Sequence, residues 1–283
     1  MSLTKKSFSI PSKHNQRQIT GDITFELSGQ SKPIVLYIHG FKGFKDWGHF
    51  NLMAEHFGNA GFVFVKINLS HNGTTPENLS DTMDLEAFGR NNFSIEQDDI
   101  NSVLDYFESE DFPVSHSEIN LEKVYLVGHS RGGGAAIIKT AEDSRIKKLV
   151  TWASVSDLTF FISEEILPQW KEDGVFYIMN ARTNQKMPLY YQIVEDFQSN
   201  KARFTVLEQA ANIKVPHLVI HGDQDETIDL QSAHDIHKCS PNSELFVVKD
   251  GLHSFGGTHP YDHQELPVHA KIVILKTINF FED

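Results

Sequence analysis

The sequence has few of the features that mark secreted, membrane-spanning or nucleic-acid-binding proteins. It contains one cysteine, Cys239, in 283 residues, so no intramolecular disulfide can form and a reducing compartment such as the cytoplasm is expected. The longest apolar runs, such as 34–38 and 62–65, are too short to span a bilayer, and no apolar signal-peptide stretch follows the lysines of 1–13. Acidic residues outnumber basic ones 38 to 25, and the net charge of −13 repels phosphate backbones. We therefore expect neither a membrane nor a nucleic acid among the partners.

The remaining composition is that of an ordinary globular protein. Hydrophobic residues make up 40% and charged residues 22%, which is enough apolar material for a packed core and too little charge for a disordered chain. The length suits a single core, with or without an insertion, and does not require two domains. A homodimer is compatible with this composition.

Short apolar runs alternate with helical patterns along most of the chain. The runs rich in β-formers are Ile34–Ile38, Phe62–Ile67, Val124–Val127, Ile146–Trp152, His217–Ile220 and Glu244–Val248. Apolar residues at helical spacing mark Trp47–Asn59, Ile95–Phe107, Arg131–Ala141, Ser232–Lys238 and Val268–Phe281. This alternation predicts an α/β fold with a mostly parallel central sheet and helices on both faces. Alternating residues near Phe8 and over 22–27 predict antiparallel edge strands before it.

Residues 156–211 interrupt the alternation. This stretch is rich in aromatic and charged residues and falls between two predicted sheet strands. We interpret it as an inserted helical cap, which leaves 1–155 and 212–283 as the core; ordinary crossover helices are the alternative. The aromatic residues suggest an apolar or aromatic acyl group in a substrate, unless they form the interior of the cap itself.

The clearest motif is Gly128-His129-Ser130-Arg131-Gly132, which matches G-x-S-x-G. Alone the pattern is weak, but here it follows a predicted strand and opens a helix. That context places Ser130 on a sharp turn with its hydroxyl exposed, and the flanking glycines let strand and helix approach closely. Ser130 is therefore the candidate nucleophile.

A serine hydroxyl needs a base, and the base needs an acid that orients it. Among fifteen histidines, His253 directly follows a predicted strand, whereas His259, His263 and His269 lie further on. After the strand ending at Ile220, the loop offers Asp223, Asp225 and Glu226 as acids. We favour Asp225, with Asp223 second, and expect one of the three to cap the next helix.

The negative charge that develops on an attacked carbonyl needs backbone N–H donors. Arg131, directly after the nucleophile, should supply one, and Phe41 in the loop after 34–38 should supply the other. His39 is expected to hold that loop by hydrogen bonding. The nearby cations Lys42, Lys45, Arg182 and Lys186 could attract an anionic substrate, although a solvated surface is the simpler interpretation.

In these residues the sequence resembles the α/β-hydrolase fold family. The matches are His39-Gly40, the G-x-S-x-G segment, His221-Gly222-x-x-Asp225 and His253, in the family's order of nucleophile, acid and histidine. The resemblance implies that Asp225 rather than Asp223 is the acid. It is strongest to the dienelactone-hydrolase, prolyl-oligopeptidase and cinnamoyl-esterase branches.

The sequence thus predicts a serine hydrolase that cleaves a carboxylic ester of a small or medium substrate through Ser130, His253 and Asp225. An amide hydrolase of the aminopeptidase or acylaminoacyl-peptidase type would use the same residues. A binding protein without catalysis is a third hypothesis, which an intact triad disfavours. No cofactor or metal is expected, because no histidine pair has convincing ligand spacing.

Overall fold

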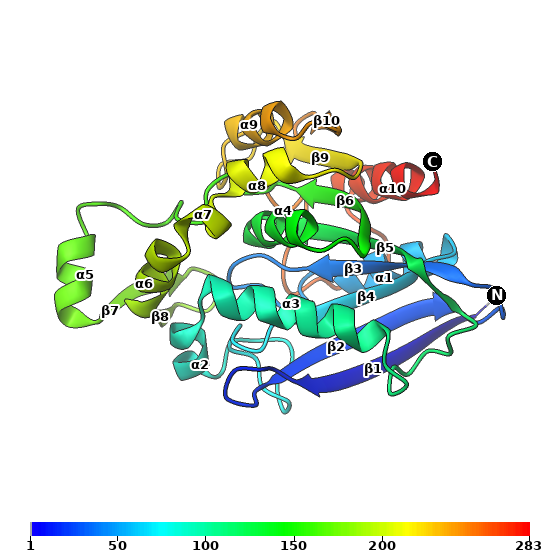
Figure 1. Cartoon of the computed structure of the whole chain (residues 1–283), viewed down its shortest axis with the longest axis horizontal. Helices are drawn as coiled ribbons and strands as arrows, with labels where there is room; N and C mark the ends of the chain where they lie inside the picture. Colours follow the sequence, from blue (N-terminus) through cyan, green and yellow to red (C-terminus); the bar gives the residue numbers. More distant parts are fainter. Residues whose placement is uncertain (1) are drawn as a thin grey trace.

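The computed structural model describes residues 2–283 and contains an eight-stranded sheet with helices on both sides (Figure 1). Side by side, the strands are β1 (Leu3–Pro11), β2 (Gln18–Glu26), β4 (Val63–Asn68), β3 (Lys32–Ile38), β5 (Ile119–His129), β6 (Ile146–Trp152), β9 (His217–Gly222) and β10 (Ser243–Val248). The six strands from β4 to β10 are parallel to one another, whereas β2 is antiparallel to both β1 and β4. The predicted fold class is confirmed.

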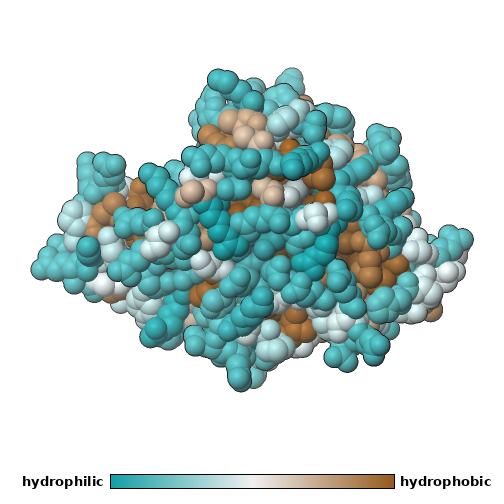
Figure 2. Space-filling view, in the orientation of Figure 1, coloured by the Kyte–Doolittle hydropathy of each residue, from teal (hydrophilic) through white to brown (hydrophobic). Residues whose placement is uncertain are grey.

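The sheet divides the hydrophobic interior into two clusters, one on each face. Residues 34–38 of β3 are completely buried, because Leu36 faces one cluster while Val35 and Tyr37 face the other. The helices that pack into the first cluster are α3 (Phe93–Phe107), α4 (Arg131–Glu142), α8 (Val206–Asn212) and α9 (Gln231–Cys239). The second cluster is closed by α1 (Phe50–Asn59) and α10 (Val268–Glu282). On the outer surface of the first face, hydrophilic residues dominate and apolar residues form separate patches (Figure 2).

The inserted segment is not purely helical, so that part of the prediction is wrong. It contains α5 (Leu167–Asp173), α6 (Gln192–Ser199) and α7 (Lys201–Phe204), but also an antiparallel hairpin of β7 (Val175–Asn180) and β8 (Gln185–Tyr190). Trp170 is buried against Phe176 and Tyr191, and its indole N–H donates to the Leu189 carbonyl at 2.8 Å. Much of the aromatic content therefore forms the interior of the insertion itself.

The insertion projects from the end of the sheet opposite the two chain termini (Figure 1). Its hairpin rests on the segment that contains α2 (Leu85–Arg90), which the sequence analysis did not predict. Arg182 pairs with Asp81 at 2.8 Å, and the Gln185 amide donates to the Thr82 carbonyl at 3.2 Å. These contacts hold the hairpin beside the loops at the carboxyl ends of the parallel strands.

Two smaller expectations around the first helix are also wrong. The helix predicted from Trp47 begins at Phe50, because Gly48 has a φ of +55°, outside the helical region. Lys45, expected on a solvated surface, is buried and paired with Asp22 and Asp46. None of the helices in residues 2–283 combines the length and apolarity needed to cross a membrane.

Candidate active site

Ser130 lies at the turn between β5 and α4, with φ +56° and ψ −123°. A residue with a side chain adopts this conformation at a cost of order 1–3 kcal/mol, so the surroundings must enforce it. The Ser130 N–H donates to the Trp152 carbonyl of the neighbouring strand at 2.9 Å, and the Ser130 carbonyl accepts from Gly133 at 2.9 Å. The strained turn predicted for a nucleophile is present.

Glycines make this turn sterically feasible. A Cβ on Gly128 would come within 2.3 Å of the Gly132 carbonyl oxygen, and a Cβ on Gly132 within 2.4 Å of the His39 oxygen. A Cβ on Gly40 would meet the Cβ of Ser130 at 2.9 Å. The strand, the helix and the loop after β3 therefore converge on Ser130 at distances that only glycine permits.

This packing predicts a sharp difference between two glycines of α4. Gly132→Ala should lower the free energy of unfolding by about 3 kcal/mol, because its Cβ meets backbone atoms that cannot rotate away. Gly134→Ala should change it by no more than about 1 kcal/mol, because its Cβ meets only side-chain methyl groups and alanine favours the helix. Urea unfolding of both variants checks this, and equal losses would contradict it.

Asp225 and His253 are joined directly, although they are 28 residues apart. The His253 Nδ1–H donates to Asp225 Oδ2 at 2.8 Å, and the aspartate side chain is completely buried. The other oxygen, Oδ1, accepts from the backbone N–H groups of Thr227 and Ile228 at 2.8 and 2.9 Å. Burial by itself would raise the pKa of Asp225, but hydrogen bonds from His221 and His253 outweigh it and hold that pKa well below its usual range. The carboxylate is thus charged and leaves Nε2 of His253 as the proton acceptor.

The loop that carries His253 is anchored by residues whose role the sequence did not indicate. His129 donates through Nε2 to the His253 carbonyl at 2.9 Å, so the residue before the candidate nucleophile holds the candidate base. Asp223, the second choice for the acid, accepts from the Asp250 N–H at 2.7 Å and ties the acid loop to the histidine loop. A side chain that bonds to a distant backbone group leaves no pattern in the sequence.

Ser130 and His253 line the same cavity, which has a volume of about 240 Å³. Ser130 is 6% exposed, and no hydrogen bond joins its hydroxyl to the imidazole in the part of the chain that the structure describes. Such bonds are often long in unliganded sites and tighten when substrate binds. The fold therefore brings the three predicted residues to one place, with the Asp225–His253 pair already formed.

Of the two proposed oxyanion donors, Phe41 lines the same cavity and Arg131 directly follows Ser130. Within residues 2–283, neither the Phe41 N–H nor the Arg131 N–H makes a hydrogen bond to another group, as expected for a loop and for the first turn of a helix. Their side chains support each other, because the Arg131 guanidinium lies 4.3 Å from the centre of the Phe41 ring. Arg131 also pairs with buried Glu96. Two unused donors thus stand beside Ser130.

His39 holds the Phe41 loop, as the sequence predicted. Its Nδ1 donates to the Gly40 carbonyl at 2.9 Å, and its Nε2 accepts weakly from the Leu69 N–H and the Asn72 amide, each at 3.4 Å. Burial lowers the pKa of His39 to about 4, so the ring is neutral at pH 7. It is not placed to act as the base.

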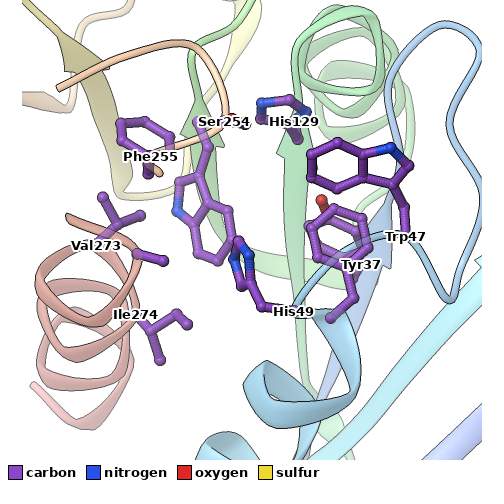
Figure 3. A pocket seen from close by; sticks show the side chains of 11 residues that line it. Tyr37, Trp47, His49, His129, Ser254, Phe255, Val273 and Ile274 are labelled. Atoms are coloured by element: carbon purple, nitrogen blue, oxygen red, sulfur yellow. The ribbon is translucent and has the colours of Figure 1, made fainter. Parts of the chain in front are cut away.

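A second, much smaller cavity lies behind the wall of the first and shares Trp47, Phe50, His129 and Ser254 with it (Figure 3). Its volume is about 20 Å³, and one water needs roughly 10–15 Å³ on the same measure. The buried Tyr37 hydroxyl and His49 Nδ1 close to it have no hydrogen-bond partner among residues 2–283. This space has room for about one water molecule, so the larger cavity is the candidate substrate site.

The alternative histidines have other surroundings. His259 accepts from the Gly48 N–H at 3.0 Å and packs edge-on against Phe44, so it fixes the loop before α1. His263 packs against Tyr261. No three histidine, cysteine, aspartate or glutamate side chains of residues 2–283 are grouped so that they could hold a metal ion.

Several buried histidines make stability sensitive to acid. Burial is the largest cause that lowers the pKa of His39 and His49 to about 4 and that of His129 and His217 to about 3. Between pH 6.5 and about 4 the unfolded chain takes up protons that the folded protein excludes, so stability falls with falling pH by about 1.4 kcal/mol per pH unit for each histidine. The pKa of Asp99, which burial raises to about 6, offsets part of this loss.

Urea unfolding at pH 7, 6 and 5 should therefore show a steady loss of stability. In a His217→Gln variant the slope against pH should be shallower by about one proton. The exposed His234 provides the matched control, because His234→Gln should leave the slope unchanged. Equal stability at pH 7 and pH 5 would contradict the expectation.

This fold, with its strained serine and its histidine–aspartate pair, is a serine-hydrolase-type α/β-hydrolase fold, and the protein is a hydrolase. The chain belongs to the prolyl oligopeptidase family, whose model matches residues 48–258. The rat (Rattus norvegicus) monoacylglycerol lipase ABHD6 is 25% identical over 264 residues, covering 79% of this chain and 70% of that protein. Est1E from Butyrivibrio proteoclasticus is 17% identical and covers 97% of both chains, with a TM-score of 0.66. A dienelactone hydrolase from Anabaena variabilis is 16% identical over 100% of this chain and 98% of its own, also with a TM-score of 0.66.

Proposed function

We propose that this protein is a carboxylic-ester hydrolase that works through an acyl-enzyme on Ser130. The observation that carries the proposal is a serine at φ +56° that lines one cavity with a histidine hydrogen-bonded to a buried aspartate. A structural role does not require a strained serine, two unused backbone N–H donors in the residues beside it and a histidine paired with a buried, charged aspartate. The non-catalytic hypothesis leaves this combination unexplained.

In the proposed reaction the Ser130 oxygen attacks the ester carbonyl while Nε2 of His253 takes the hydroxyl proton. Asp225 stabilises the resulting imidazolium through its bond to Nδ1. The N–H groups of Phe41 and Arg131 hold the negative oxygen. His253 then gives its proton to the departing alcohol, and water, activated by the same imidazole, releases the acid from Ser130.

We further propose that residues 156–211 act as a cap on a core of 1–155 and 212–283. Asn180 and Arg182, from the end of β7 and the turn after it, are the insertion residues that line the 240 Å³ cavity among those the structure describes. The cap therefore contributes polar groups to the site, whereas Trp170 and Phe176 pack against each other and Phe161 packs against Phe41.

An amide-hydrolysing activity is the second candidate, because the family is named for peptidases. An aminopeptidase needs a carboxylate to bind the substrate's ammonium group, and none of the described residues that line the cavity is aspartate or glutamate. This observation argues against an aminopeptidase.

The test compares p-nitrophenyl esters with aminoacyl anilides and adds labelling by a fluorophosphonate probe. We expect rapid ester turnover, little anilide turnover and a phosphonyl adduct on Ser130. Faster turnover of the anilides would favour the peptidase. Folded protein that neither labels nor turns over any substrate would overturn the proposal in favour of a binding protein.

A further inference from the structure

The described residues that line the active-site cavity include cations but no acidic residue, although the chain as a whole is acidic. The protein has 38 acidic and 25 basic residues, yet no aspartate or glutamate of residues 2–283 lines the cavity. Two cations do, Lys42 from the loop after β3 and Arg182 from the hairpin of the insertion.

Lys42 is a half-buried cation without a compensating anion. Its ammonium lies 5.9 Å from the centre of the Phe41 ring, and it forms no ion pair or hydrogen bond with any other part of the described chain. The two other lysines of this region, Lys45 and Lys66, are buried and paired with Asp22 and Asp46. Burial lowers the pKa of Lys42, as expected for an ammonium that loses water and gains no carboxylate.

The backbone conformation at Lys42 also suggests that the lysine side chain has a function. Its φ is +60°, a conformation that glycine adopts at lower cost than any residue with a side chain. A lysine therefore occupies a position that the backbone alone would give to glycine. Lys42 follows Phe41, whose N–H should hold the oxyanion, and it lines the same cavity as Ser130.

Arg182 adds directional donors but little net charge. One of its terminal nitrogens donates to Asp81 at 2.8 Å, while its other guanidinium nitrogens have no hydrogen-bond partner within residues 2–283. Asp81 pairs with this charge, so Lys42 is the cavity-lining cation of the described residues that has no acidic partner. A single ammonium matches a singly charged carboxylate better than a doubly charged phosphate.

We infer that the preferred substrates are esters that carry a second, ionised carboxylate, which Lys42 binds with help from Arg182. This inference rests on the proposed ester hydrolysis and adds the chemical class of the substrate. Lys42 is thereby a residue that determines specificity and takes no part in bond making or breaking.

The experiment uses matched ester pairs that differ only in the charge. On the acyl side, the mono-4-nitrophenyl ester of adipic acid is compared with its methyl ester; on the alcohol side, 3-butyryloxybenzoate is compared with its methyl ester. We expect wild-type kcat/KM to favour the carboxylate by about tenfold or more in at least one pair, the size typical of one charge-assisted hydrogen bond. Added salt should reduce this ratio.

The variants test which cation is responsible. Lys42→Gln should remove most of the preference, Lys42→Arg should retain it, and Arg182→Gln should weaken it less. The matched control is Lys186→Gln, because Lys186 is exposed in the same hairpin and does not line the cavity. The ratio within each variant is the readout, so a general loss of activity does not affect it.

The outcomes separate this inference from the proposed function. Two outcomes would overturn the inference and leave the function standing. One is Ser130-dependent turnover of the neutral esters with no preference for the carboxylate; the other is a carboxylate preference that survives Lys42→Gln. Absence of all turnover would overturn the function. In that case calorimetric binding of the adipate ester to Ser130→Ala decides: weaker binding after Lys42→Gln supports the inference, and equal binding contradicts it.

Discussion

Ser130→Ala should lower kcat/KM for a p-nitrophenyl ester by at least ~10⁴-fold, the loss usual when the nucleophile of a triad is removed. The change removes only the hydroxyl oxygen and leaves the other groups of the site in place. The Asp225–His253 pair and the unused N–H groups of Phe41 and Arg131 remain, so the variant should still bind the ester. We therefore expect the loss to fall on kcat rather than KM.

The fold of this variant should be unchanged, because the Ser130 hydroxyl makes no hydrogen bond within residues 2–283 and alanine meets the same backbone constraint. Thermal unfolding and circular dichroism would establish this. The fluorophosphonate probe supplies an internal control, since Ser254 lines the same cavity and should remain unlabelled in both proteins. Ester turnover within tenfold of wild type, or an adduct on Ser254, would show that the nucleophile lies elsewhere.

Among the elements whose bounds were predicted best are two helices that pack on the sheet. The helix expected over 131–141 is observed as Arg131–Glu142, and the helix over 268–281 as Val268–Glu282. In these segments the apolar residues at helical spacing are the residues that become buried, so the pattern alone predicts the helix. The nucleophile turn was equally predictable, because glycine spacing reflects a steric requirement that is local in sequence.

The insertion was predicted less well, for a physical reason. The hairpin Val175–Tyr190 is half-exposed and packs on α2, so its pattern depends on a partner almost a hundred residues earlier. Arg182 reaches the cavity only because that docking places its turn there. Contacts of this kind are created by tertiary structure and have no local counterpart in the sequence.

The sequence favoured Asp225 over Asp223, the family resemblance supported that choice, and the geometry now allows a direct test. Asp225→Asn should lower kcat by about 10³–10⁴-fold at pH 7. Oδ1 is held by the N–H groups of Thr227 and Ile228, so the asparagine oxygen will keep that place and its NH₂ group will face His253. An amide donor facing Nδ1 forces the imidazole to carry its proton on Nε2, where it can no longer accept the proton of Ser130.

Asp223→Asn is the matched control, one loop position away and with the same loss of charge. The Asp223 oxygen accepts from the Asp250 N–H at 2.7 Å, and an asparagine oxygen can do the same. We expect kcat within about tenfold of wild type, since the loop that carries His253 stays anchored and the imidazole of His253 keeps its proton on Nδ1. The reverse order, with the larger loss in the Asp223 variant, would assign the role of the acid to Asp223.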